Sequence, residues 1–328
     1  MSTQPLETPA AAPSRTTEFA LLLALATLWG GSYTFIKLGV ETIPPLTLIA
    51  ARTLIAGLIL LAVMRWRGLR MPRDLTAWRR FLTQALLNSV VPFTLIAWAE
   101  RSVDAGLASI LNGTTPVFVF LISLALMPGR RPDWRKGLGV AAGVAGISLI
   151  VGVDAFSGLG SQAMPQLAIV AATIAYACAA LFGRHFTGMD PLLPAAGSML
   201  TGTALLIPAA LIVDRPWTLA PSRESLFALL ALSVFSTALA FAIYFRLIRT
   251  LGSVGTTAVS YLRVPIGVAI GLLFLGERLQ PTAWAGLALV VLGVMAMTLP
   301  ERKSGAGSST GPKSGIRFSE ESDAIPMR

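Results

Sequence analysis

Residues 105–127 read AGLASILNGTTPVFVFLISLALM and contain no charged side chain. A helix of this length is about 35 Å long and spans the roughly 30 Å of hydrocarbon in a bilayer. A slide of the sequence by 149 residues places this run on residues 254–276, VGTTAVSYLRVPIGVAIGLLFLG, and Pro116 then matches Pro265. We therefore expect a membrane protein with an internal duplication.

The composition supports this expectation. Of 328 residues, 54% are hydrophobic and 13% are charged, and the mean hydropathy is +0.71. One soluble core could not bury so much apolar surface. Eight further apolar runs of span length bring the number of predicted transmembrane helices to ten, and they lie near 18–39, 44–64, 81–100, 135–153, 165–186, 191–213, 225–247 and 282–300.

The duplication divides the chain into halves of five spans. A slide of 147 residues matches Trp29 with Tyr176 and Pro44 with Pro191, so spans one and two correspond to spans six and seven. The slide of 149 matches spans three to five with spans eight to ten. Because five is odd, the second half must be inverted relative to the first, as in many secondary transporters. We expect an all-α fold of two inverted five-helix repeats, at 17–153 and 164–300, with disordered cytoplasmic tails at 1–16 and 301–328.

The basic residues predict the orientation. The chain has 26 Lys and Arg residues against 16 acidic residues, a formal net charge of +10. With a cytoplasmic N-terminus, 19 of the 26 lie in cytoplasmic loops and tails, five lie outside, and Arg52 and Arg263 lie within spans. This asymmetry predicts a multi-pass protein of the bacterial inner membrane with both termini in the cytoplasm. No basic stripe with interleaved aromatics indicates nucleic-acid binding.

Two alternatives for single segments were weighed. Residues 24–26, Ala-Leu-Ala, weakly resemble a signal-peptide cleavage site, but the first span has a counterpart later in the chain. Glycines between 137 and 146 superficially resemble a dinucleotide loop, but they lie in a predicted membrane helix with no preceding strand. With one cysteine, Cys178, and one histidine, His185, the chain offers neither a thiolate metal cluster nor a His-rich one. We expect no cofactor, no metal and no catalytic residue.

Several motifs resemble a known family. Residues 28–33 read LWGGSY, residues 99–118 read AERSVDAGLASILNGTTPVF, and residues 260–279 read SYLRVPIGVAIGLLFLGERL. Together they resemble the EamA-type branch of the drug/metabolite transporter superfamily. The resemblance implies a ten-helix inner-membrane carrier that exports amino acids, related metabolites or toxic compounds. One departure is that the first half has Met127-Pro128 where the second has Gly276-Glu277.

Arg263 is the leading candidate for function. It lies well inside the ninth predicted span, and a guanidinium at that depth normally faces a partner or a water-filled cavity. The acidic residues of the spans and their loops all lie at span ends, so the carboxylate of a substrate could be its partner. The alternative is a structural clamp on backbone carbonyls. For Arg52 we expect a structural role, in which it snorkels or pairs with Glu41 or Glu100.

The other candidates are polar, aromatic or helix-breaking residues near the predicted pathway. Each has a structural alternative as helix glue, packing kink or interfacial anchor. The predicted substrate-binding set is Arg263, Tyr261, Ser260, Asn112, Thr115, Asn88, Trp29, Tyr33 and Tyr244. The predicted gating or coupling set is Glu100, Glu277, Pro116 and Pro265.

The sequence favours a secondary carrier that exports small metabolites by alternating access and is not an enzyme. Its expected partners are a small-molecule substrate and the lipid bilayer, and the sequence leaves open whether it forms a homodimer. One rival is a membrane enzyme acting on lipid-borne substrates, which would need convergent His, Asp or Glu residues. The other is a non-transporting sensor or scaffold, which would not need a polar lane through the membrane.

Overall fold

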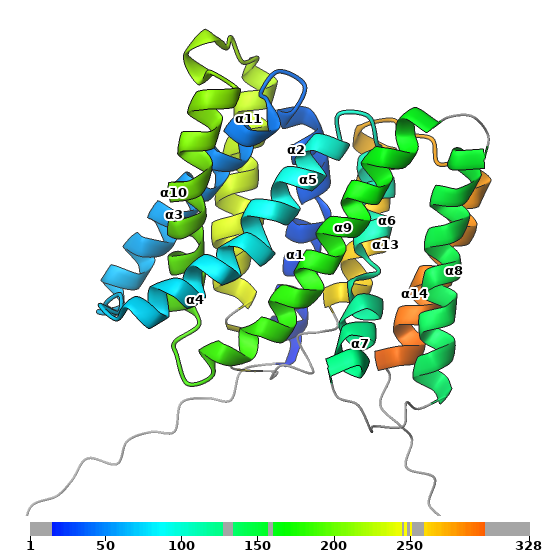
Figure 1. Cartoon of the computed structure of the whole chain (residues 1–328), viewed down its shortest axis with the longest axis horizontal. Coiled ribbons are helices and arrows are strands. Elements are labelled where there is room, and N and C mark those ends of the chain that lie inside the picture. Colours follow the sequence, from blue (N-terminus) through cyan, green and yellow to red (C-terminus); the bar gives the residue numbers. More distant parts are fainter. Residues whose placement is uncertain are drawn as a thin grey trace, which may run out of the picture. The chain divides into compact units, whose positions relative to one another are not determined.

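Helices make up the described part of the chain, as shown in the computed structural model of Figure 1. The structure describes residues 15–126, 134–156, 160–244, 246–247, 250 and 259–298. Residues 1–14 and 301–328 of the predicted tails lie outside these ranges. All described residues belong to one unit, Met1–Thr298.

The first half makes five passes. Two of these passes are interrupted, at Gly31 and at Gly113–Thr114, and the third contains a stretch of π-helix. The elements are α1 (Arg15–Gly30) with α2 (Ser32–Gly39), α3 (Pro45–Trp66), α4 (Leu75–Ala85) with η1 (Leu86–Val90) and α5 (Val91–Ala99), α6 (Ala105–Asn112) with α7 (Thr115–Leu126), and α8 (Trp134–Phe156).

The second half repeats this arrangement. Its elements are α9 (Gly160–Phe182) with the 3-10 turn η2 (Gly183–Phe186), α10 (Leu192–Val213), the turn η3 (Pro216–Thr218), α11 (Arg223–Ser233) with η4 (Val234–Leu239), α13 (Val259–Phe274) and α14 (Pro281–Thr298). Seven helical runs are long and apolar enough to cross a membrane, and shorter apolar helices lie at Lys136–Ile150, Leu262–Phe274 and Pro281–Ala296. The predicted all-α fold of ten membrane helices is confirmed.

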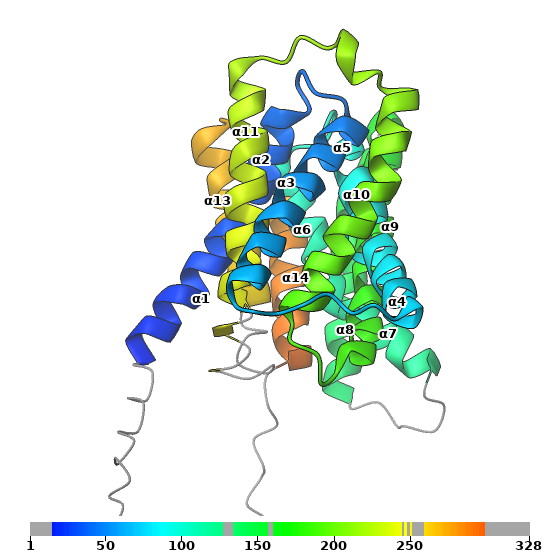
Figure 2. The same ribbon diagram turned by 90° about the vertical axis from the view of Figure 1, so that its left-hand side faces the viewer.

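The packing of the helices follows a pseudo-twofold relation. The first pass packs on the ninth through α1 and α13, and the fourth packs on the sixth through α6, α7 and α9. Likewise the first pass packs on the eighth through α2 and α11, and the third packs on the sixth through α5 and α9. The corresponding helices α3 and α10 pack on each other, as do α8 and α14 (Figures 1 and 2). These exchanged contacts are those expected of two inverted repeats.

The π-helical stretches are a further sign of the duplication. The slide of 149 residues places η1 on the residues of η4. Both stretches interrupt the regular pattern of a membrane helix, and π-bulges of this kind are frequent at functional sites. The predicted span at 81–100 gave no sign of the π-helical stretch, because it contains no proline or glycine before Pro92.

The third pass begins earlier than predicted. We expected a span from residue 81, whereas α4 begins at Leu75 because the Asp74 side chain accepts a hydrogen bond from the Ala77 N–H at 3.1 Å. The added turn carries Arg79 and Arg80, which suit a membrane interface. The apolar run alone therefore underestimated the helix.

The two paired prolines differ in local structure. Pro116 is the second residue of α7, directly after the break at Gly113–Thr114. Pro265 lies inside α13, which continues through it. The helix is thus interrupted just before Pro116 in the fourth pass and continues through Pro265 in the described part of the ninth.

Candidate substrate-binding site

Asn112 is the centre of a polar cluster inside the bundle. It ends α6 with a side chain only 3% exposed. Its amide Nδ2 donates to the Tyr33 hydroxyl of α2, and its Oδ1 accepts from Thr173 of α9 at 3.3 Å and from Thr115 of α7 at 3.4 Å. Its carbonyl oxygen accepts from Arg263 of α13 at 3.2 Å. One asparagine therefore joins side chains from the first, fourth, sixth and ninth passes.

The break in the fourth pass explains why that carbonyl oxygen needs partners. In a continuous helix the Asn112 carbonyl would accept from the N–H of residue 116, but Pro116 has none. Arg263 supplies one replacement, and the Thr115 hydroxyl supplies another at 2.7 Å. Buried carbonyls without partners are costly, so Pro116 creates the site that Arg263 occupies.

A glycine brings the first and ninth passes close together. A Cβ added at Gly30 would lie 2.8 Å from the carbonyl oxygen of Arg263 and 3.0 Å from the backbone nitrogen of Gly267. A larger residue would push α1 away from α13. Gly30 of the LWGGSY motif therefore allows the first pass to lie against the ninth at Arg263.

Arg52 is a second cation in the interior, and its predicted pairing with an acid is wrong. It is 5% exposed, its Nε donates to the Thr237 hydroxyl of η4 at 3.0 Å, and its guanidinium lies 3.8 Å from the centroid of the Phe93 ring. Burial by the third and eighth passes prevents it from snorkelling to water. Neither Glu41 nor Glu100 forms an ion pair with it within the described ranges.

The interior therefore holds two guanidinium groups near the same aromatic residues. Arg52 and Arg263 both lie close enough to Tyr33 and Tyr176 to interact with them electrostatically. Tyr176 in turn packs on Phe93, with ring centroids 6.3 Å apart. Among the described residues, the single ion pair is the one between Arg246 and Glu18. In that part of the chain no carboxylate is paired with either interior arginine, which favours binding of an anion.

Two other predicted aromatic residues form a separate group. Trp29 packs on Tyr244 at 5.4 Å and on Phe241 at 6.4 Å, joining the first pass to the eighth. Trp29 precedes Tyr33 by four residues, although the break at Gly31 separates them. These rings line the junction of α1 with the end of the eighth pass rather than the Asn112 cluster itself.

The remaining substrate-site candidates are placed less closely. Asn88 is half-buried within η1. Ser260 and Tyr261 lie in α13, but their side chains fall outside the part of the chain that the structure describes. Their proposed contact with a substrate stays a prediction.

Glu277, a predicted gating residue, caps a helix. Its Oε1 accepts from the Ala105 N–H at 2.6 Å and its Oε2 accepts from the Gly106 N–H at 2.9 Å. These are the first N–H groups of α6, where a negative charge is favourable. A Cβ at Gly106 would lie 3.1 Å from Oε2, so glycine there admits the carboxylate. The LGE segment thus fixes the start of the helix that ends at Asn112.

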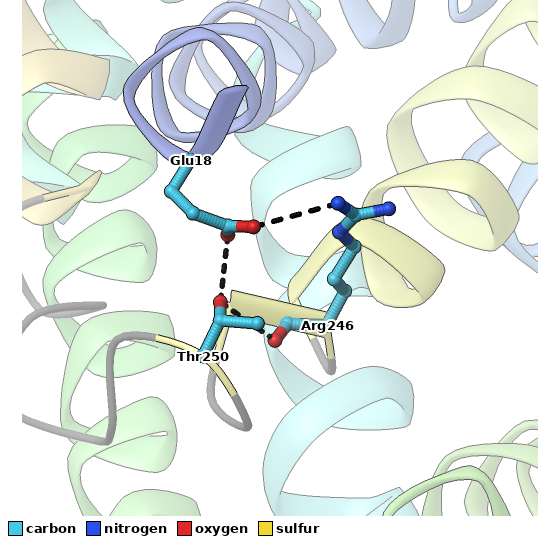
Figure 3. A network of polar contacts seen from close by, with 3 residues as sticks. All are labelled: Glu18, Arg246 and Thr250. Atoms are coloured by element: carbon cyan, nitrogen blue, oxygen red, sulfur yellow. Dashed lines mark hydrogen bonds and ion pairs between the residues drawn. The ribbon is translucent and has the colours of Figure 1, made fainter. Parts of the chain in front are cut away.

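A third polar group joins the first pass to the chain that follows the eighth. Figure 3 shows Glu18, at the start of α1, between Arg246 and Thr250. The buried Glu18 carboxylate accepts from the Thr250 hydroxyl at 2.6 Å and from Arg246 at 3.4 Å. The Arg246 side chain is 55% exposed, so solvent reaches that half of the contact.

With the ten-helix geometry established, comparison with known proteins identifies the family. The model described as the EamA-like transporter family matches residues 16–152 and again 164–299. The chain belongs to the EamA-like transporter family. It is a membrane transporter of the drug/metabolite type, and not an enzyme.

Relatives of this EamA-like transporter include two proteins similar along most of their length. It is 28% identical over 282 residues to "Uncharacterized inner membrane transporter YedA" of Escherichia coli (strain K12), covering 86% of this chain and 90% of that protein. It is 27% identical over 279 residues to "Probable terminal-alkyne amino-acid exporter" of Streptantibioticus cattleyicolor, covering 84% and 91%. A crystal structure of another protein shares the fold, with a TM-score of 0.61 at 19% identity, over 88% of this chain and 100% of that one.

Sequence reasoning missed two residues of the interior of this EamA-like transporter. Thr173 was not among the candidates, although a buried threonine within an apolar span is a signal of interhelical hydrogen bonding. Arg52 was expected to be peripheral, because its distance from the start of its span suggested access to water. Its contact with Phe93 depends on how the second pass crosses the third, and the sequence does not specify that crossing.

Proposed function

We propose that this EamA-like transporter exports small metabolites that carry a carboxylate, such as amino acids and related compounds, from the bacterial cytoplasm. The observation behind the proposal is Arg263. It is half-buried inside the bundle, donates one hydrogen bond to the Asn112 carbonyl, and has no carboxylate partner among the described residues. The carboxylate of a substrate would provide that partner through the remaining guanidinium N–H groups.

The surrounding residues support a site for an amino-acid-like molecule. Tyr33, Asn112 and Thr115 supply hydroxyl and amide groups to the cluster that Arg263 joins through the Asn112 carbonyl. Such groups suit hydrogen bonds to an ammonium or a polar side chain. Arg52 contributes a second positive charge to the same interior, which raises its affinity for anions. The name of one relative as an amino-acid exporter agrees with this substrate class.

Transport by alternating access would follow from the two repeats. The four passes joined at Asn112 come from both halves, so movement of one half against the other changes which end of the bundle the cluster faces. The positive-inside asymmetry supports an orientation in which both termini face the cytoplasm. The proposal holds for a monomer or a homodimer, because one chain supplies the whole cluster.

Counterflow in proteoliposomes tests this function. Vesicles containing the full chain are preloaded with an unlabelled amino acid, and uptake of the radiolabelled compound is measured. Matched pairs, such as L-leucine and L-leucinamide, differ in the carboxylate that Arg263 is proposed to bind. We expect counterflow of at least one neutral amino acid and none of its amide. Equal transport of both compounds, or transport of no amino acid in a full panel, would contradict the proposal.

A further inference from the structure

Glu100 differs from Glu18, the other acid that is buried among the described residues. It directly follows α5, and its side chain is 0% exposed. Its backbone N–H donates to the Ile96 carbonyl at 2.9 Å. By contrast, both oxygen atoms of its side chain lack a hydrogen-bond partner within the described part of the chain. The backbone is therefore held in place, while the carboxyl group is buried without a hydrogen bond.

Three other carboxylates near helix ends show what a bonded acid looks like in this protein. Glu18 accepts from Thr250 and Arg246, and Glu277 accepts from two backbone N–H groups. Asp214 accepts from both the N–H and the hydroxyl of Thr47, at 2.8 and 2.9 Å. Each of these carboxylates is stabilised as an anion by its donors. Glu100 has no such donor among the described residues.

The charged groups around Glu100 are engaged elsewhere. Lys37, Arg52 and Glu277 are the charged residues near enough to act on it electrostatically. The Lys37 ammonium donates to the Val103 carbonyl at 2.8 Å, and Arg52 is held by Thr237 and the Phe93 ring.

The charges of these neighbours differ in sign. Glu277 adds a negative charge near Glu100 while it caps α6. The hydroxyls of Tyr33 and Tyr176, which complete the surroundings, also interact electrostatically with Glu100. Two cations are thus opposed by one anion and by burial. None of these five neighbouring side chains donates a hydrogen bond to the carboxyl group in the described structure.

An ionised carboxylate that is buried without hydrogen bonds is far less stable than the neutral acid. A buried charge without hydrogen bonds normally acquires a proton or becomes exposed to water. The loop 100–104 joins α5 to α6 at the end of the bundle opposite to the start of α1 (Figure 1). Opening of that end would hydrate the carboxyl group and permit ionisation.

We propose that Glu100 is a proton-binding site, occupied while the 100–104 end of the bundle is closed and emptied to water when that end opens. On opening, the O–H bond of the acid breaks, the proton passes to water, and the electron pair stays on the carboxylate. Low pH on that side therefore favours closure and high pH favours opening. This inference rests on the alternating-access part of the proposed function, but not on the substrate.

The first test measures the proton itself. Infrared spectra of the purified full chain in nanodiscs at neutral pH should contain a carbonyl stretching band of a protonated carboxyl group. The band should vanish in Glu100→Gln and persist in Glu18→Gln, whose parent acid is buried but bonded. Glu100→Asp should restore a band at a shifted frequency. Wild-type and Glu100→Gln spectra that coincide in this region would overturn the proposal.

The second test follows opening without any substrate. A single cysteine replaces Val103, which is 1% exposed, in a Cys178→Ser background. Its alkylation rate is measured against pH in the presence and absence of Glu100→Gln. The Gln variant reports the pH dependence of the thiol alone. We expect a rise with pH several-fold steeper when Glu100 is present. Superimposable profiles would refute the coupling of proton release to opening.

A second neutral variant guards against a local defect. Glu100→Met cannot ionise either and should match Glu100→Gln in both tests. Counterflow of amino acids tests the substrate separately, since these two readouts need none. Absence of counterflow with an intact Glu100 band would remove the proposed substrate and leave the proton site standing.

Discussion

Arg263 donates a hydrogen bond to the carbonyl oxygen of Asn112 across 3.2 Å. The bond joins the ninth pass to the fourth at the point where the fourth is broken. The side-chain amide of the same asparagine donates to the Tyr33 hydroxyl of the first pass. A helix break, a cation and a polar cluster are thus a single structural unit.

Restoring the helix at the break should impair transport without unfolding the protein. Pro116→Ala supplies an N–H that can donate to the Asn112 carbonyl, so Arg263 loses its role there. We expect thermal stability in detergent to be equal or higher and counterflow to fall at least tenfold. Pro208→Ala, in the interior of α10, is the matched control and should leave counterflow largely unchanged. A Pro116→Ala protein with normal counterflow would show that the break is only a packing feature.

The charge of Arg263 should matter more than its contact with the backbone. Gln can still donate to the Asn112 carbonyl but cannot bind a carboxylate by charge. A cationic contact of this kind is worth on the order of a few kcal/mol, so Arg263→Gln should weaken substrate affinity about a hundredfold. Arg263→Lys keeps the charge but not the planar guanidinium, so its substrate affinity should lie between those of the wild type and Arg263→Gln.

Substrate-induced thermal stabilisation, measured with flux, separates the two roles of Arg263. A structural clamp would lower yield or melting temperature in both variants. An Arg263→Gln protein that folds normally and binds an amino acid with wild-type affinity would exclude the proposed contact.

The sequence predicted the helices better than it predicted the site. Apolar runs, paired prolines and an odd number of spans per half were enough for the ten-helix architecture. They were not enough to predict that the break before Pro116 opens a carbonyl to Arg263, because that contact depends on how the fourth pass packs on the ninth. The contacts of Thr173 and Arg52 were not predicted for the same reason, since their partners lie on other passes.

Removing the cap at Glu277 should destabilise the start of α6. Glu277→Ala leaves the N–H groups of Ala105 and Gly106 without acceptors, which should cost about 1 to 2 kcal/mol. Glu277→Gln keeps one acceptor oxygen, but its amide nitrogen cannot accept from the second N–H and the favourable charge is lost, so we expect a loss smaller than that of Glu277→Ala but not zero. Thermal unfolding in detergent measures the stability of both variants. Arg278→Ala, which changes the exposed neighbour of Glu277, is the control. Equal stability of Glu277→Ala and wild type would contradict the capping role.

The orientation can be tested by labelling single cysteines in a Cys178→Ser background. Trp217 is 70% exposed in the loop between α10 and α11, and a cysteine in its place should react with an impermeant maleimide in intact cells. Arg67 is exposed in the loop between α3 and α4, and a cysteine in its place should react only after the membrane is permeabilised. The reverse pattern would place both termini outside the cytoplasm.

The contact of Glu18 should depend more on Thr250 than on Arg246. Thr250 donates a short bond of 2.6 Å to the buried carboxylate, and a hydrogen bond to a charged group contributes about 1.5 to 3 kcal/mol. Arg246 lies 3.4 Å away with its side chain 55% exposed, so water can replace it, and such pairs contribute about 0 to 1 kcal/mol. Thr250→Val should therefore lower the melting temperature in detergent more than Arg246→Gln does. Thr218→Val, which removes an exposed hydroxyl bonded only to a carbonyl within the described structure, provides the background value. A larger loss in Arg246→Gln than in Thr250→Val would mean that charge, and not the short hydrogen bond, joins the first pass to the chain after the eighth.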